Sequence, residues 1–170
     1  GADGNDTVIV GLGQDTLQGG NGSDTLVYTR VNSSITVDLA QQSSSGGAGI
    51  DYIYGFENII APNSASCLIG DTSNNTIIAG SGNDTVLGGN GLNSLDGGAG
   101  LNTLSYNDHT GALTLNLLAG TADGGISRTD TFTGFINVIG SSSSDSIIGD
   151  AASNSIIGGA GDDIIEGGGG

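Results

Sequence analysis

Six aspartates stand at the same place in a recurring frame, and they carry the clearest chemistry of this sequence. Most of them follow a glycine-rich run, and each precedes a large aliphatic residue by two positions. They are Asp6, Asp15, Asp24, Asp84, Asp145 and Asp163. A carboxylate beside glycine carbonyls offers only oxygen ligands, which suits a hard cation. The pattern therefore predicts a row of metal sites.

Other repeats hold a neutral residue at the same frame position. Asparagine occurs at Asn75, Asn93, Asn102 and Asn154, and serine at Ser66. An amide oxygen can bind a cation but brings no charge, and stacked amides can join adjacent chain segments without metal. We expect strong sites at the pairs Asp6/Asp24 and Asp145/Asp163. A site shared by Asp84 and Asn102 is expected to be weaker, and Asn75/Asn93 to be empty.

The turn glycines are expected to add backbone carbonyl ligands, because their carbonyls have no strand partner. The glycines placed in the candidate sites are Gly4, Gly13, Gly20, Gly22, Gly82, Gly91, Gly98, Gly100, Gly159 and Gly161. Calcium takes about 6–8 oxygens in a flexible shell, whereas magnesium prefers a tight octahedron. Zinc favours His and Cys, of which the chain has one each. The cofactor expected is therefore Ca²⁺, with several ions bound.

A plainer interpretation is that these aspartates only favour turns, as Asp commonly does. For one isolated turn that interpretation would prevail. Here the acid recurs in one frame, from "GADGNDTVI" at 1–9 and "GGNGSDTLV" at 19–27 to "GGAGDDIIE" at 158–166. This recurrence favours the metal sites.

The nine-residue frame also predicts the elements that position these acids. Six turn residues precede a three-residue strand, whose central aliphatic side chain points inward. The predicted inward column is Val8, Leu17, Leu26, Leu68, Ile77, Val86, Leu95, Leu104, Ile147, Ile156 and Ile165. Two nonamers make one coil of about 18 residues, and coils stack about 4.8 Å apart. We expect a narrow aliphatic core without aromatic side chains.

A longer period overlies the nonamers. Matching segments recur 78 or 79 residues apart, such as "DYIYGFENII" (51–60) and "DTFTGFINVI" (130–139). We predict one solenoid over 1–170, made of a first unit (1–78), a second unit (79–157) and the start of a third (158–170). The segments 28–65 and 106–140 are interpreted as coils with longer turns or spacers, with loops at 41–49 and 118–125. A flexible linker at 28–65 is the alternative.

The composition narrows the possible partners. Eighteen acids face two basic residues, giving a net charge of −16, and glycine supplies 34 residues. Such a chain repels nucleic acid and anionic membranes and attracts cations. No apolar run is long enough for a membrane span. Both ends lie inside repeats, which indicates a piece of a longer protein.

The frame G-G-x-G-x-D-x-U-x, with U a large aliphatic residue, is itself a known signature of calcium-binding parallel β-helices. On these repeats, strongest at 1–27, 79–105 and 158–166, the chain resembles the RTX family of haemolysin-type calcium-binding repeats. The resemblance implies an all-β fold, a right-handed parallel β-roll or β-solenoid. It also implies calcium-driven folding after export, with type I secretion to the outside of a bacterial cell. Carried over to this chain, the position-six ligands are the six aspartates named above.

Two other reactive residues are assigned plain roles. His109 lies in "YNDHTG" near Ser105 and Asp108, but we expect a polar turn there and no catalysis. Cys67 takes an outward strand position and is expected to be a partly exposed thiol. The residue after the inward aliphatic is often apolar as well, which predicts lateral contact strips. Those positions are Ile9, Val27, Ile69, Ile78, Leu87, Ile148 and Ile157.

The function expected is structural. Calcium would fold and stiffen the chain, which then serves as a spacer or assembly region of a bacterial surface protein, S-layer or adhesin-like. Neighbouring copies, other domains of the same protein or cell-surface glycans are possible partners. The alternative is an accessory or carbohydrate-binding module of a secreted enzyme such as an epimerase, lipase or protease. No enzyme activity is expected within the 170 residues.

Overall fold

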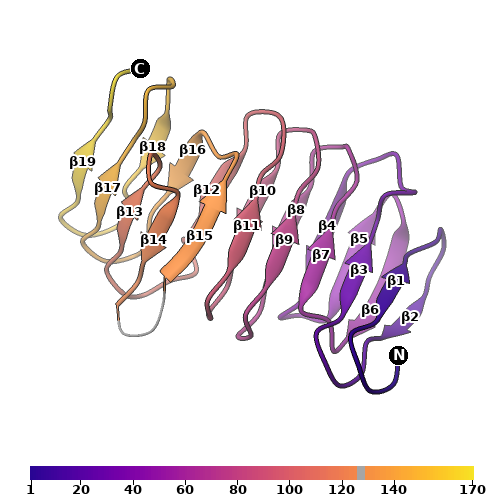
Figure 1. Ribbon diagram of the computed structural model, residues 1–170. Coiled ribbons are helices and arrows are strands. Elements are labelled where there is room, and N and C mark those ends of the chain that lie inside the picture. The colour runs from indigo at the N-terminus through magenta and orange to yellow at the C-terminus, as the bar shows by residue number, and fades with distance from the viewer. Residues whose placement is uncertain (126–128) are drawn as a thin grey trace.

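The chain coils into two facing β-sheets, as Figure 1 shows for a computed structural model that describes residues 1–125 and 129–170. Successive strands alternate between the sheets, except that β4 to β6 (residues 35–54) all lie in one sheet and β13 to β15 (residues 114–133) all lie in the other. Residues 18 apart, such as Thr7 and Thr25, pair in parallel register. The predicted 18-residue coil and the β-roll are confirmed, and the described residues contain no helix.

The strands are short because each nonamer returns to a glycine turn after three residues. The ten-stranded sheet runs in the order β1 (Thr7–Ile9), β3 (Thr25–Val27), β7 (Asn58–Ile60), β9 (Thr76–Ile78), β11 (Ser94–Asp96), β15 (Thr129–Thr133), β14 (Thr121–Asp123), β13 (Thr114–Asn116), β17 (Ser146–Ile148) and β19 (Ile164–Glu166). The nine-stranded sheet runs in the order β18 (Ser155–Ile157), β16 (Asn137–Ile139), β12 (Thr103–Ser105), β10 (Thr85–Leu87), β8 (Cys67–Ile69), β4 (Ile35–Asp38), β5 (Ser43–Gly46), β6 (Gly49–Tyr54) and β2 (Thr16–Gln18).

The two segments that break the nonamer count are built into the sheets. Each adds one reversed strand: β5 pairs antiparallel with β4 and β6, and β14 pairs antiparallel with β13 and β15. The prediction of loops at 41–49 and 118–125 is therefore wrong, since both segments contain a strand. Serine and threonine are compatible with strands, and here their backbone completes the ladder between two parallel neighbours.

The inward column forms the core in the middle of the stack. Leu26, Leu68, Val86 and Leu104 have no exposed surface, whereas Val8, Leu17 and Ile156 are only partly buried. Ile165 is 45% exposed, because no further described coil covers β19.

The expectation of a core without aromatic side chains is wrong. Five rings are buried, all contributed by the two segments with longer turns: Tyr28, Phe56, Tyr106, Phe132 and Phe135. The rings of Phe132 and Phe135 meet edge to face with centroids 6.0 Å apart. An added strand widens the coil locally, and large side chains fill the extra width.

Corresponding strands of the first and second units lie in opposite sheets. Residues 1–78 contain the nine strands β1 to β9, and residues 79–157 contain the nine strands β10 to β18. Three successive strands of each unit share one sheet, so the chain enters a sheet seven times per unit; because seven is odd, β1 belongs to the ten-stranded sheet and its counterpart β10 to the nine-stranded sheet. No stretch of the described chain forms a helix of membrane-spanning length.

Candidate metal centre

The position-six side chains lie immediately before the strands, where they stack along the two edges of the roll. Six of them accept a hydrogen bond from a backbone N–H one coil away: Asp24, Asp84, Asn93, Asn102, Asp145 and Asp163. Asp24 Oδ1 lies 2.7 Å from Asp6 N, and Asn102 Oδ1 lies 2.9 Å from Asp84 N. The pairs Asn75/Asn93 and Asp145/Asp163 repeat this contact at 2.9 Å. We call this arrangement the side-chain ladder.

The structure distributes the sequence-predicted position-six residues over both edges of the roll. Asp6, Asp24, Asn75, Asn93, Asp145 and Asp163 precede strands of the ten-stranded sheet, and Asp15, Asp84, Asn102 and Asn154 precede strands of the nine-stranded sheet. Asp24, Asp84, Asp145, Asn75, Asn93 and Asn102 are buried, whereas the remaining four are half-buried. Asp15 and Asp24 therefore lie on opposite edges, while Asp6 and Asp24 are in contact.

The predicted turn glycines all adopt the left-handed backbone region, with φ between 67° and 142°. A side chain there would also meet the neighbouring turn, since a Cβ on Gly22 would overlap the carbonyl oxygen of Gly4. Backbone carbonyls therefore point along the stack from one turn toward the next. Glycine is favoured at all ten positions for its φ, and the close approach adds a second reason at all of them except Gly4 and Gly13, where a Cβ would meet nothing.

A second glycine position, the first of each nonamer, lies against the position-six carboxylate. A Cβ on Gly19 would overlap the Gly55 carbonyl oxygen and lie 2.6 Å from Asp24 Oδ2. These two acceptor oxygens therefore border the same small space. Gly140 repeats the arrangement with the Asp145 carboxylate. The sequence analysis did not include these glycines.

The second unit shows how an asparagine fills the same space. Asn102 is the counterpart of Asp24, and Gly97 and Gly134 are the counterparts of Gly19 and Gly55. Asn102 Nδ2 donates to the carbonyl oxygens of Gly97 at 2.7 Å and Gly134 at 2.9 Å. The amide joins two coils where Asp24 presents an oxygen. An amide N–H₂ thus takes the place that a cation would have beside a carboxylate.

Two further asparagines join coils in a similar way. Asn75 Nδ2 donates to the Glu57 carbonyl at 2.8 Å, and Asn154 Nδ2 donates to the Ile136 carbonyl at 2.9 Å. Asn93 differs, because its buried Nδ2 has no hydrogen-bond partner. Amide contacts between coils, expected as an alternative to metal, are present at Asn75, Asn102 and Asn154.

Two buried carboxylate oxygens lack any hydrogen-bond partner, Asp24 Oδ2 and Asp84 Oδ2. Both residues are almost fully buried, with 0% and 1% of their surface exposed. Burial raises the pKa of Asp84, and the hydrogen bond from Ser66 N partly offsets that rise. An unpaired buried anionic oxygen is costly. A bound cation would remove that cost, so these residues fit one.

Three acids that the sequence analysis missed extend the side-chain ladder. Glu57 Oε2 accepts from Asp24 N at 2.7 Å, Asp51 Oδ1 from Asp15 N at 3.0 Å, and Asp130 Oδ1 from Asn93 N at 2.9 Å. The signal was present in the sequence. Each of the three precedes an inward apolar residue by two positions, as the nonamer aspartates do. The loss of the glycine frame around them concealed it.

Not every ladder acid has a free oxygen. Asp145 accepts from Leu113 N, Ser141 N and Ser141 Oγ, at 2.8, 2.6 and 2.8 Å. Asp51 and Asp130 accept from buried hydroxyls, those of Ser44 and Tyr106. Among these acids, Asp24 and Asp84 therefore present the least satisfied oxygens.

The turn expected at His109 is present, since its N–H donates to the Tyr106 carbonyl at 2.9 Å, but the side chain is buried. Its ring stands edge-on to Tyr106 with centroids 5.1 Å apart, and Nδ1 lies 2.8 Å from Asp108 Oδ1.

In the described ranges, no three His, Cys, Asp or Glu side chains converge as a metal-binding group. A cation bound at the turns of the side-chain ladder would therefore take part of its ligands from backbone carbonyls.

The turns supply carboxylate, amide and carbonyl oxygens, stacked coil upon coil along the edges of a parallel β-roll. Oxygen-only ligands in a glycine-lined, adaptable site are the preference of calcium. Fold and site together define a repeat protein of the calcium-binding β-roll class.

The comparison with known families agrees with this class. The chain belongs to the RTX calcium-binding nonapeptide repeat family, whose model matches in four copies at residues 1–32, 44–57, 69–104 and 139–170. Membership implies a structural module that binds calcium ions. Such repeats typically occur in secreted proteins, which indicates an extracellular location. No curated protein matches the chain as a relative.

Proposed function

We propose that this chain is a calcium-gated structural segment, stiff when calcium occupies its turns and loosened when calcium is removed. The single observation that carries the proposal is the bare, buried Oδ2 of Asp24 facing the Gly55 carbonyl. Without the ion, carboxylate and carbonyl oxygens lie close together with no positive charge between them, in a chain whose net charge is −16. Calcium binding energy then becomes folding energy.

The geometry of the side-chain ladder supports particular positions for the proposed ions. Asp6, Asp24 and Glu57 form the densest acidic run, with three acids on consecutive coils. Calcium bound there would neutralise carboxylates and draw carbonyl ligands from both turns. Asp145 and Asp163 form a second acidic pair. The asparagine ladder between them requires no ion where its amides already join coils.

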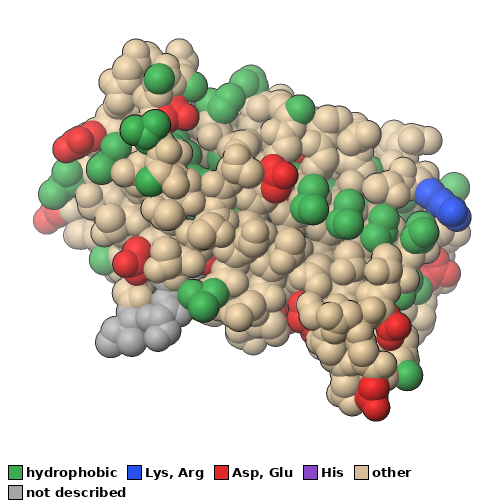
Figure 2. Space-filling model, viewed as in Figure 1, with side chains coloured by type: hydrophobic (Ala, Val, Ile, Leu, Met, Phe, Trp, Pro, Cys, Tyr) green, Lys and Arg blue, Asp and Glu red, His purple; other side chains and the backbone are tan. Residues whose placement is uncertain are grey.

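The proposed biological role is a spacer or assembly region of a bacterial cell-surface protein, S-layer or adhesin-like, exported by a type I system. One apolar row supports assembly. Ile9, Val27, Ile60 and Ile78 lie in register on the outer side of the ten-stranded sheet, and Asp96 ends the row. Figure 2 shows this row of hydrophobic side chains along the visible face.

The calcium proposal is tested by circular dichroism and thermal unfolding of the chain in calcium, in magnesium and in EDTA. We expect a β-sheet signal and a cooperative transition in calcium, and loss of both in EDTA, with magnesium far less effective. A β-signal and melting temperature unchanged by EDTA would contradict the proposal.

The assembly role has its own test. Sedimentation of the chain in calcium should show association that the double variant Ile60→Thr/Ile78→Thr removes, because threonine keeps the strand preference but shortens the apolar row. The matched control is Ile157→Thr on the other sheet. A chain that stays monomeric at high concentration would exclude lateral assembly through this row.

A binding role, as in the accessory region of a secreted enzyme, is the second candidate. It is favoured by a surface of the first unit around Tyr52 and Tyr54, the two exposed tyrosines.

A further inference from the structure

Strand β6 exposes an aromatic side of the roll. Ile50, Tyr52 and Tyr54 alternate outward with 59%, 48% and 36% of their surface exposed, whereas Asp51 and Ile53 point inward and are buried. Strand geometry places the two tyrosines on one face, roughly 7 Å apart. The other five aromatic side chains of the protein are buried.

Small polar side chains border the two rings on both sides. Thr16 and Gln18 on β2 lie in register with Tyr52 and Tyr54. Ser43 and Ser45 on β5 lie in register with Tyr52 and Ile50. Neighbouring strands are about 4.8 Å apart, so these hydroxyl and amide groups lie within reach of a ligand placed on the rings. We call these seven residues the tyrosine face, and none of them is charged.

An acid stands at the margin of the tyrosine face. Asp38 on β4 lies in register with Ser43, on the side of β5 away from β6. Its side chain is half-buried, and Oδ1 accepts from Gln41 N at 2.8 Å. A carboxylate in that place can also accept hydrogen bonds from hydroxyl groups of a ligand.

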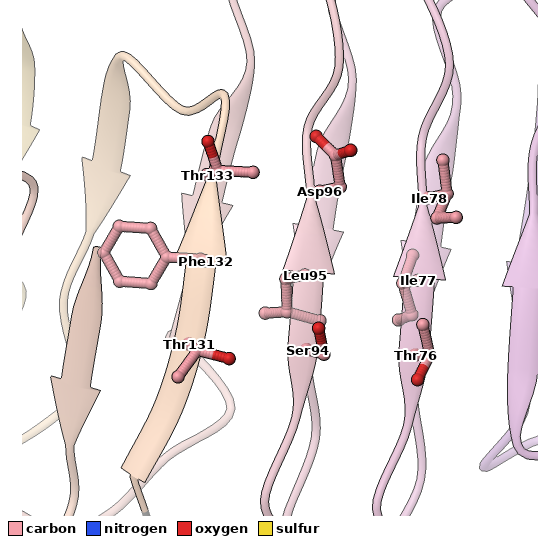
Figure 3. A pocket seen from close by; sticks show the side chains of 9 residues that line it. All are labelled: Thr76, Ile77, Ile78, Ser94, Leu95, Asp96, Thr131, Phe132 and Thr133. Carbon is pink, nitrogen blue, oxygen red and sulfur yellow. The ribbon is translucent and has the colours of Figure 1, made fainter.

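The second unit has the same order and pairing of strands but no aromatic ring at the two outward positions. Thr131 and Thr133 on β15 take the places of Tyr52 and Tyr54, and they pair with Ser94 and Asp96 as the tyrosines pair with Thr16 and Gln18. Figure 3 shows these threonines lining a hollow on the outer side of the ten-stranded sheet. The fold therefore does not need the tyrosines, and their exposure in the first unit requires another explanation.

We propose that the tyrosine face binds an uncharged polysaccharide. A flat exposed ring offers an apolar surface to the C–H side of a sugar ring, and flanking hydroxyl, amide and carboxylate groups match sugar hydroxyls. Acidic polymers are disfavoured, because the chain carries a net charge of −16 and the tyrosine face offers no basic side chain. This inference rests on the binding role named above as the second candidate function, to which it gives a ligand class, and it requires only that the roll be folded.

The test is affinity electrophoresis of the chain in calcium through gels containing dextran, laminarin, galactomannan or hydroxyethyl cellulose, with alginate as the acidic comparison. The double variant Tyr52→Thr/Tyr54→Thr copies the second unit, so it keeps the strand preference. The matched control is Leu12→Thr, which removes a side chain that is 77% exposed on a turn. Circular dichroism confirms that each variant is folded.

We expect at least one neutral polymer to retard the chain, the double variant to lose about tenfold or more in affinity, and Leu12→Thr to bind like the original. Failure of all four neutral polymers to retard the folded chain would overturn the inference, as would unchanged binding by the double variant. Retardation by alginate alone would overturn it too. Binding that persists in EDTA would contradict calcium gating while supporting the tyrosine face.

Discussion

Replacing Asp24 by asparagine should stabilise the calcium-free protein, although it removes a proposed calcium ligand. The second unit has asparagine at the equivalent position, where the Asn102 amide donates hydrogen bonds to the Gly97 and Gly134 carbonyls. In Asp24→Asn, the new amide would donate to Gly19 and Gly55 in the same way. The contact of Oδ1 with Asp6 N would be kept.

The magnitude follows from the groups involved. Asp24→Asn removes an unpartnered buried oxygen, which costs about 1–3 kcal/mol, and adds two neutral hydrogen bonds of about 0.5–1.5 kcal/mol each. These contributions sum to about 2–6 kcal/mol in EDTA, with a midpoint of about 4 kcal/mol. For a chain of this length that midpoint corresponds to a melting temperature roughly 8–16 °C higher.

In calcium the order should reverse or vanish. The wild-type chain gains binding energy at this turn, about 2.7 kcal/mol for an ion at a hundred times its Kd, and the variant forfeits most of that gain. Thermal unfolding in EDTA and in calcium measures both effects, and calorimetric titration counts the ions. Asn102→Asp should show the opposite pattern. Asp162→Asn removes one exposed charge without a bridge and should change stability by less than about 0.5 kcal/mol.

The reasoning is refuted if Asp24→Asn lowers the melting temperature in EDTA while Asp162→Asn does not. That result would mean that the Asp24 oxygen is not an uncompensated group in the calcium-free chain. An unchanged number of bound ions in Asp24→Asn would separately remove this residue from the set of ligands.

Gly19→Ala should destabilise the protein by about 3 kcal/mol in urea unfolding, because its Cβ would overlap a backbone carbonyl. The control Gly11→Ala, whose Cβ would have its nearest contact at 4.0 Å, should change the stability by less than about 0.5 kcal/mol. Equal effects of the two substitutions would argue against the close approach at Gly19. Burial raises the pKa of Asp84, so in metal-free buffer its contribution to stability is present below about pH 3.8 and is lost as the pH rises through the higher folded-state pKa. The urea midpoint should therefore gain more from pH 7 to 3.5 in the wild type than in Asp84→Asn, and parallel profiles would contradict this. Burial and the charge of Asp38 raise the pKa of the Cys67 thiol, so alkylation at pH 8 should be slower in the folded chain than in urea, and faster in Asp38→Asn than in wild type; an unchanged rate in Asp38→Asn would refute the charge effect.

The nonamers made much of the fold predictable. A strict frame fixes which side chain points inward, so the coil length, the strand positions and the buried place of Leu26 or Leu104 followed from spacing alone. The same frame predicted that Asp6 and Asp24 meet, and the structure places them in contact. Whether they bind calcium together remains a prediction.

The segments between the nonamers were less predictable. The serine-rich residues 43–46 carry no alternation of apolar and polar side chains, and they form β5 because two neighbouring strands supply its hydrogen-bond partners. The buried rings and the ladder acid Glu57 were missed for a related reason. Their roles depend on the wider coil and on contacts between stacked coils, and the nine-residue sequence repeat does not predict these features.

The odd number of times that each unit enters a sheet has a geometric consequence for any longer run of such units. In each added unit of nine strands, a given strand lies in the sheet opposite to that of its counterpart in the previous unit. Equivalent surface features of consecutive units therefore alternate between the two sides of the rod. A patch carried by every unit would face both flanks of the rod in turn. A patch restricted to alternate units, as tyrosines in one and threonines in the next, would give the rod two chemically distinct flanks.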